Sequence, residues 1–191
     1  MKLEIIKIPG FMDVNSAILE TEGKRYAFDP WGQAADWTGR NIDAVFVTHG
    51  HFDHVIGLAG TNIPWYMDMA DLEIFEESHG YLATFGRKIE TAPTTLSAAP
   101  KIKGMEIIKT PGHSEGSVCF YFPSEKILLT GDTLFVDTIG RTDFPGGNHE
   151  TLIASLILLK SHNFPPDTLI VPGHGETATW SEVLKTNPYM Q

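Results

Sequence analysis

The chain has 191 residues, a formal net charge of −10 and 42% hydrophobic residues. A chain of this length buries about 70% of its unfolded surface, which suits one domain or two packed halves. Its acidity and lack of clustered Lys and Arg exclude a nucleic-acid binder, and no window approaches the ~18 apolar residues of a membrane span. The N-terminus lacks the apolar stretch of a signal peptide, and the single Cys119 excludes an internal disulfide. We therefore expect a cytoplasmic protein.

Strand-like and helix-like runs alternate through the first half of the chain. Residues 16–21 and 25–29 flank a glycine-containing turn and predict a β-hairpin. Residues 43–48 are β-branched and aromatic, as is typical of a short buried strand. A helix is expected at 55–59, with the two residues before it in its first turn, and another at 69–77. Residues 91–99 are rich in Pro, Thr and Ala and predict a loop between two halves.

The second half repeats this order weakly. Strands are expected at 105–109, at 117–120 and 127–132 around a turn at 124–126, and at 167–174, with a helix at 152–159. The hairpin and the later strand of the first half are echoed here, which indicates an internal repeat. The alternation predicts a mixed α/β fold. Strands in both halves end in Asp or His, and the carboxyl ends of strands are where α/β sheets bind ligands.

The strongest motif is Thr-His-Gly-His-Phe-Asp-His at 48–54. His49 and His51 are two residues apart, so in an extended chain their side chains point the same way. Asp53 and His54 follow in the first turn of the expected helix. Imidazole and carboxylate groups are suitable ligands for Zn, Fe or Mn. This loop is therefore predicted to bind metal.

Three further candidates follow other strands. His113 comes after the strand at 105–109, where Gly112 allows a sharp turn. Asp132 ends the buried strand at 127–132, and His174 lies between glycines after the last strand. Five of the eight histidines thus occupy strand-end turns. Each candidate alone is more often structural, but together they favour a single metal-binding constellation.

These motifs resemble the metallo-β-lactamase fold superfamily. The HxHxDH motif and the later PGHS, TGDT and PGHG segments match it in order and spacing over nearly the whole chain. Residues 140–147 (GRTDFPGG) and 187–190 (NPYM) are similar to small single-domain type II glyoxalase-like (hydroxyacylglutathione hydrolase-like) hydrolases, and the GRTDF stretch also resembles persulfide dioxygenases. The resemblance implies a four-layer αβ/βα sandwich, one domain over 1–191 with pseudo-repeat halves of about 1–95 and 100–191.

The resemblance also implies two divalent metal ions. Zinc is the first expectation, with iron or manganese as alternatives. Asp53 and Asp132 are the carboxylates expected to take part in catalysis, Asp132 by orienting both metals and accepting a proton. The implied ligands are His49, His51 and His113 for the first metal, Asp53, His54 and His174 for the second, and Asp132 bridging both.

The expected reaction is hydrolysis of a small-molecule thioester resembling a hydroxyacylglutathione. A hydroxide shared by two metals would attack the carbonyl, and a thiolate, with a thiol pKa near 8.5, leaves without a dedicated acid. Lactone or other ester hydrolysis is open on the same site. So is a mononuclear iron persulfide dioxygenase with a triad of His49, His113 and Asp132. A non-catalytic metal-binding module is a further class, and the oligomeric state is open.

Two loops carry contested residues. Arg141 and Asp143 either contact a substrate carboxylate or pin the loop at 140–147 by pairing with each other. Phe11 and Met12, before the first hairpin, either form an apolar flap near the metals or belong to an ordinary surface turn. Phe11, Met12 and Arg141 are thus the predicted substrate contacts.

Overall fold

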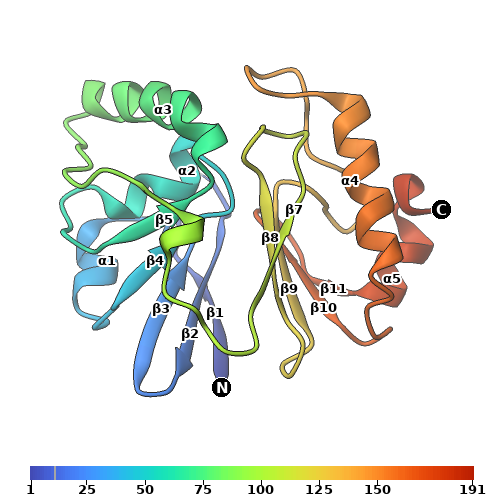
Figure 1. The fold of residues 1–191 in the computed structure, drawn as a ribbon. Coiled ribbons are helices and arrows are strands. Elements are labelled where there is room, and N and C mark those ends of the chain that lie inside the picture. Colours follow the sequence, from blue (N-terminus) through green and yellow to red (C-terminus); the bar gives the residue numbers. More distant parts are fainter. Residues whose placement is uncertain (11) are drawn as a thin grey trace. The chain divides into compact units, whose positions relative to one another are not determined.

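The computed structural model describes residues 1–10 and 12–191 and divides the chain into two compact units, Met1–Lys101 and Ile102–Gln191 (Figure 1). Each unit contains a mixed β-sheet together with helices, which confirms the predicted α/β class. Phe11, one of the predicted substrate contacts, lies outside the described residues.

The sheet of the first unit has the strand order β1-β2-β3-β4-β5-β6. Neighbouring strands from β1 to β3 are antiparallel, and those from β3 to β6 are parallel. The strands are β1 (Lys2–Lys7), β2 (Asn15–Thr21), β3 (Lys24–Phe28), β4 (Ala44–Phe46), β5 (Trp65–Met67) and β6 (Thr94–Thr95). The helical segments are α1 (Ala34–Thr38), α2 (Phe52–Val55), α3 (Leu72–Thr84) and the 3₁₀ turns η1 (Ile56–Leu58), η2 (Met69–Asp71) and η3 (Leu96–Ala98).

The predicted hairpin is confirmed as β2 and β3. Its register pairs Thr21 with Lys24, which leaves a two-residue connection. Glu22 and Gly23 both have positive φ, 50° and 73°, as a type I′ turn requires. A type I′ turn matches the right-handed twist of the strands. It sets the register of β3 against β2 and thereby the residue at which β3 ends.

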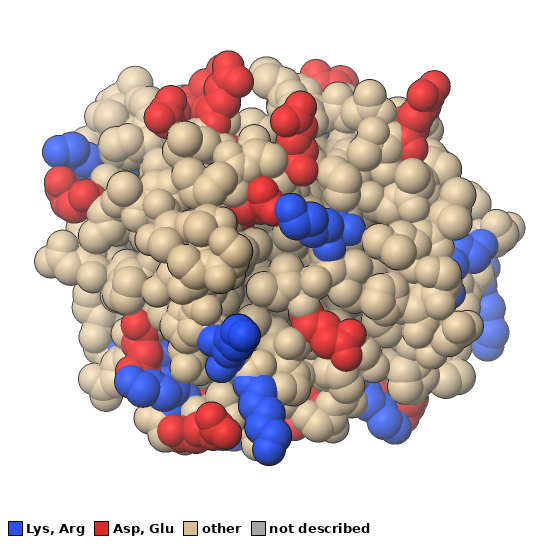
Figure 2. Space-filling view, in the orientation of Figure 1, with Lys and Arg blue, Asp and Glu red and all other residues tan. Residues whose placement is uncertain are grey.

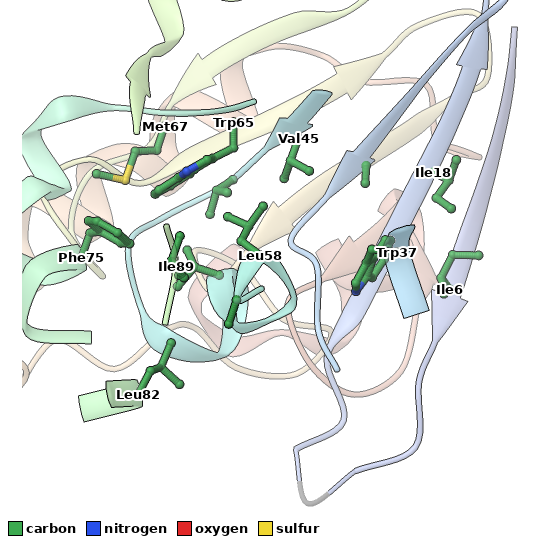
Figure 3. Close-up of a cluster of buried hydrophobic side chains, with 14 residues drawn as sticks. Ile6, Ile18, Trp37, Val45, Leu58, Trp65, Met67, Phe75, Leu82 and Ile89 are labelled. Atoms are coloured by element: carbon green, nitrogen blue, oxygen red, sulfur yellow. The ribbon is translucent and has the colours of Figure 1, made fainter. Parts of the chain in front are cut away.

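One face of this sheet packs against the helices (Figure 3). Along β4 the side chain of Val45 points into a buried cluster with Trp37 of α1 and Trp65 of β5. Phe75 of α3 packs edge-on against Trp65, with ring centroids 4.9 Å apart. Truncation of such buried aromatics typically costs about 3–5 kcal/mol. This packing holds α2 and α3 against the sheet and so restrains the loop that leaves β4.

The sheet of the second unit has the order β11-β10-β9-β8-β7. The pairs β7–β8, β8–β9 and β10–β11 are antiparallel, whereas β9 and β10 are parallel. Helices α4 and α5 lie together on one face of this sheet (Figure 1), with η4 packed against both. The elements are β7 (Glu106–Lys109), β8 (Val118–Phe122), β9 (Ile127–Gly131), α4 (His149–Ser161), β10 (Leu169–Pro172), β11 (Ala178–Thr179), α5 (Trp180–Thr186) and η4 (Pro188–Met190).

Three predicted segments differ from the structure. Where a helix is expected at 55–59, α2 ends at Val55 and the 3₁₀ turn η1 follows. The helix expected at 69–77 begins as the 3₁₀ turn η2, where the Asp68 side chain accepts a hydrogen bond from Ala70 N, and continues as α3 to Thr84. The loop expected at 91–99 contains β6 and η3, because Thr94 and Thr95 pair with β5. A two-residue strand is too short to produce a recognisable pattern.

Charged side chains are interspersed on the face shown in Figure 2, where groups of Lys and Arg are separated by Asp, Glu and uncharged residues. Some oppositely charged side chains form ion pairs, such as Lys24 with Asp43 at 2.8 Å and Lys126 with Asp167 at 2.6 Å. Over residues 1–10 and 12–191, no helix is both long and apolar enough to cross a membrane.

Candidate metal centre

The HxHxDH loop follows the carboxyl end of β4. This strand lies between β3 and β5 in the sheet and runs parallel to both. Its metal-binding atoms lie within 4.8 Å of one another in three pairs, His49 with His51, His49 with His54, and Asp53 with His54. The rings of His49 and His54 are 4.1 Å apart, and those of His49 and His51 are 4.8 Å apart. His49, Asp53 and His54 are buried, and His51 is half-buried. The first unit thus gathers four candidate ligands on one short segment.

A buried carboxylate, Asp29, organises this loop from the end of β3. Asp29 Oδ1 accepts the backbone N–H of Thr48 at 2.7 Å, and Oδ2 accepts the Thr48 hydroxyl at 2.7 Å. Oδ2 also lies 3.0 Å from His54 Nδ1. The backbone N–H of Asp29 reaches the carbonyl of Phe46 at 3.2 Å, because β3 and β4 run parallel. Asp29 therefore contacts one candidate ligand directly.

The same network determines which nitrogen of His49 faces the metal. The Thr48 hydroxyl lies 3.0 Å from His49 Nδ1 and has its own proton directed to Asp29. The hydroxyl therefore accepts from Nδ1–H, which leaves His49 Nε2 as the metal-binding atom. A carboxylate behind an imidazole fixes the ring and raises its basicity as a ligand.

The loop is also tied to the start of α3. The backbone N–H of Gly50 donates to Asp71 Oδ2 at 2.9 Å, and Asp71 is fully buried. This hydrogen bond lies between His49 and His51 in the chain. It restrains the segment on which both side chains depend, because a hydrogen bond to a buried charged group is worth about 1.5–3 kcal/mol.

The second unit brings its three candidates together from separate segments. Asp132 Oδ2 lies 3.7 Å from His113 Nε2 and 3.6 Å from His174 Nε2. These separations are too long for hydrogen bonds but suit two ligands of one ion, each about 2.1 Å from it. His113 is buried, whereas the side chains of Asp132 and His174 are 14% and 24% exposed. The cluster is therefore accessible through Asp132 and His174.

The loop at 140–147 supports this cluster. The carbonyl of Arg141 lies 2.8 Å from His113 Nδ1, so Nδ1 carries the proton and Nε2 faces Asp132. A Cβ on Gly140 would lie 1.8 Å from the carbonyl oxygen of Asp132, so only glycine fits there. Gly112 has φ 138°, which confirms the sharp turn expected before His113.

Arg141 and Asp143 pair with each other, as the structural alternative predicts. Arg141 Nε and Nη2 donate to the two carboxylate oxygens of Asp143 at 2.7 and 2.6 Å, and the guanidinium lies 3.9 Å from the ring centroid of Phe144. The hydrogen bonds from Arg141 lower the pKa of Asp143 to about 2. A role for Arg141 or Met12 in substrate binding stays a prediction, and Met12 is half-buried.

The donor set fits a divalent metal. All seven predicted ligands lie in clusters of imidazole and carboxylate groups, four in the first unit and three in the second. The orientation of three of the imidazoles is set by protein oxygens, those of Thr48, Asp29 and Arg141. The sequence prediction missed Asp29 and Asp71. The signal for Asp29 is the internal repeat, which places it where Asp132 stands in the second half.

Comparison with known proteins places this arrangement in a family. The sequence model of the Metallo-beta-lactamase superfamily matches residues 16–174. The chain is 33% identical to "Hydroxyacylglutathione hydrolase GloC" of Haemophilus influenzae, over 100% of this chain and 98% of that protein.

Two solved structures are similar over almost their full length. The di-iron-bound form of TTHA1623 is 31% identical with a TM-score of 0.82, covering 97% of this chain and 99% of that chain. The BLEG-1 B3 metallo-beta-lactamase is 31% identical with a TM-score of 0.76, covering 100% of both chains. The matched segment contains every predicted metal ligand, and the chain belongs to the metallo-beta-lactamase superfamily.

Proposed function

We propose that this protein is a dinuclear metal-dependent hydrolase that cleaves a hydroxyacylglutathione-like thioester. The observation that carries the proposal is the full set of seven His and Asp donors in a chain that matches GloC from end to end. The name of that relative supports a glutathione thioester as the first substrate class to test.

The proposed division of ligands follows the family resemblance. His49, His51 and His113 would hold one ion, Asp53, His54 and His174 would hold the other, and Asp132 would be a ligand to both. The di-iron form of TTHA1623 supports two ions per chain and makes iron a candidate beside zinc. Asp132 fits a bridging role because its Oδ2 is nearly equidistant from the Nε2 atoms of His113 and His174.

Two bound divalent ions supply an activated water and polarise the substrate carbonyl. The protein side chains then have two tasks. The Nδ1 contacts hold the imidazoles in position. Asp132, which is partly exposed, accepts the proton released when water adds to the carbonyl. No side chain is required to protonate the leaving group, because a thiolate is stable near neutral pH.

The first test counts metals and measures thiol release on the same preparation. Protein purified without added metal or chelator is analysed for Zn, Fe and Mn, then assayed with S-D-lactoylglutathione and a thiol-reactive dye. The single cysteine, Cys119, is fully buried and contributes little background. We expect two metals per chain and one thiol released per substrate consumed.

The principal alternative predicts a different result. A persulfide dioxygenase using His49, His113 and Asp132 would contain one iron per chain and consume oxygen with glutathione persulfide. That combination, with no thiol release from the thioester, contradicts the proposal. Faster turnover of an alkyl lactone than of the thioester would instead assign the same site to ester hydrolysis.

A further inference from the structure

A pocket of about 430 Å³ lies in the second unit, lined by residues from the end of α4, the turn that follows it and α5. Its lining includes Phe164, Trp180 and Leu184, and none of the proposed metal ligands. A volume of a few hundred cubic ångströms is within the range of small-molecule sites. The pocket therefore needs an explanation separate from the proposed hydrolysis.

The pocket is apolar inside. Phe164 and Trp180 are 5% and 4% exposed, and their rings meet edge-on with centroids 5.2 Å apart. The backbone N–H of Trp180 donates to the carbonyl of Thr168 at 2.7 Å, and the side chain lines the pocket. Aromatic walls of this kind suit the apolar part of a small ligand.

Two lysines stand at the opening. Neither Lys160 nor Lys185 forms an ion pair within 4.0 Å in the described part of the chain. Lys160 makes one long contact, 3.4 Å, with the main-chain oxygen of Gln191. On α5, the carboxylate of Glu182 accepts hydrogen bonds from the N–H and hydroxyl of Thr179 at 2.8 and 2.7 Å, and it also interacts electrostatically with Lys185. The lining of the pocket thus includes two lysines and no acidic residue, in a protein of net charge −10.

We propose that this pocket binds a small carboxylate with a flat apolar body. The apolar part would pack against Phe164, Trp180 and Leu184, and the carboxylate would be neutralised by Lys160 and Lys185. Apolar walls with a few placed polar groups are the usual composition of such sites.

The test is a titration of zinc-loaded protein with 3-phenylpropionate, followed by ¹H–¹⁵N NMR. The chain has four tryptophans, and Trp180→Phe identifies the indole resonance of Trp180. We expect that resonance to move saturably at a ratio of one ligand per chain. The neutral 3-phenylpropionamide should bind about tenfold more weakly, because it lacks the charge that the lysines recognise.

The variant Lys160→Gln/Lys185→Gln should weaken 3-phenylpropionate binding about tenfold, while Lys126→Gln, whose lysine pairs with Asp167 outside the pocket, should not change it. Both lysines are exposed, so the double variant should fold normally. An unmoved Trp180 resonance up to 10 mM ligand overturns the proposal. So does binding that the double variant leaves unchanged, since the carboxylate would then be held at another site such as the metal centre.

Discussion

The two units of this chain share the topology of their first four strands but present their candidate metal-binding residues differently. In each unit an antiparallel hairpin is followed by a strand parallel to its second member, β2, β3 and β4 in the first unit and β8, β9 and β10 in the second. The first unit concentrates four candidate ligands at 49–54, after β4. The second collects three, from positions 113, 132 and 174.

The difference is clearest in one equivalent pair. Asp29 follows β3, and Asp132 follows β9, the corresponding strand of the second unit. The loop after β4 already carries the candidate ligands of the first unit. The carboxylate of Asp29 contacts Thr48 and His54 of that loop, so Asp29 supports ligands. Asp132 faces two imidazoles and is itself a candidate ligand. A shared topology thus supplies a carboxylate at one position, and the neighbouring loop determines its role.

We expect the largest effect from removing the carboxylate of Asp132 in the second unit. Asp132→Ala deletes the carboxylate that lies within 3.7 Å of both His113 and His174 and that is proposed to accept the proton. We expect thioester turnover to fall to background and the metal content per chain to drop. Elemental analysis and a thiol-release assay on one preparation check this.

Asp167→Ala is the matched control for that variant. Asp167 is also in the second unit, but its side chain is 62% exposed and pairs with Lys126. Its loss should leave turnover and metal content unchanged. Wild-type turnover in Asp132→Ala would contradict the proposed mechanism.

A smaller effect is expected for the equivalent carboxylate of the first unit. Asp29→Asn keeps the shape of the side chain but removes the charge beside His54 and Thr48. Loss of such an outer partner typically weakens metal binding about 10–100-fold. Competition with a chelator of known affinity measures this, and Thr48→Val, which removes only the hydroxyl, should have a smaller effect.

Asp43→Asn separates metal binding from general destabilisation. Asp43 accepts hydrogen bonds from Lys24 and from the backbone N–H of Arg25 in the same unit. We expect Asp43→Asn to lower the unfolding temperature of the protein slightly and to leave its metal affinity unchanged. Equal metal affinities for the Asp29→Asn and Asp43→Asn variants would show that Asp29 does not support metal binding.

The sequence identifies the candidate ligands of the first unit more directly than those of the second. In the first unit the motif is local, so spacing alone identifies His49, His51, Asp53 and His54. In the second unit each candidate is ordinary by itself, and only its position after a predicted strand links it to the others. The fold class and the hairpin follow from short-range patterns, which are visible in one sequence.

Supporting residues were harder to predict because they act over long separations. Asp29 reaches Thr48 across 19 residues through the parallel pairing of β3 and β4, and Asp71 reaches Gly50 across 21. Strand pairing of this kind leaves no local pattern. The carbonyl of Arg141, which orients His113, is a backbone group, so no residue type signals it.

Gly140→Ala tests whether the second unit relies on its loop as the first relies on Asp29. A methyl group there would lie 1.8 Å from the carbonyl oxygen of Asp132, so the backbone must shift. Overpacking of this kind costs about 1–3 kcal/mol of unfolding free energy. Gly39→Ala is the control, because nothing lies within 4 Å of its Cβ and its φ of −76° suits alanine. Chemical denaturation of both variants measures the difference.

The smallest effect is expected at the exposed end of that loop. Arg141 lowers the pKa of Asp143 to about 2, so Arg141→Gln should return it towards the ordinary value near 3.9. A depressed carboxyl pKa stabilises the folded state above about pH 4, and this contribution is lost as the pH falls through 2. Because the pair is exposed, the gain is small, and NMR titration of the Asp143 carboxyl is the suitable measurement.

Kinetics of the same pair distinguish loop pinning from substrate binding. If Arg141 serves only to hold the loop, Arg141→Gln and Asp143→Asn break the same two hydrogen bonds and should change kcat/KM equally and slightly. If Arg141 also contacts a substrate carboxylate, its loss raises KM, while Asp143→Asn frees the guanidinium and does not. Equal small effects would confine the supporting role of this loop to the Arg141 carbonyl behind His113, which neither substitution removes.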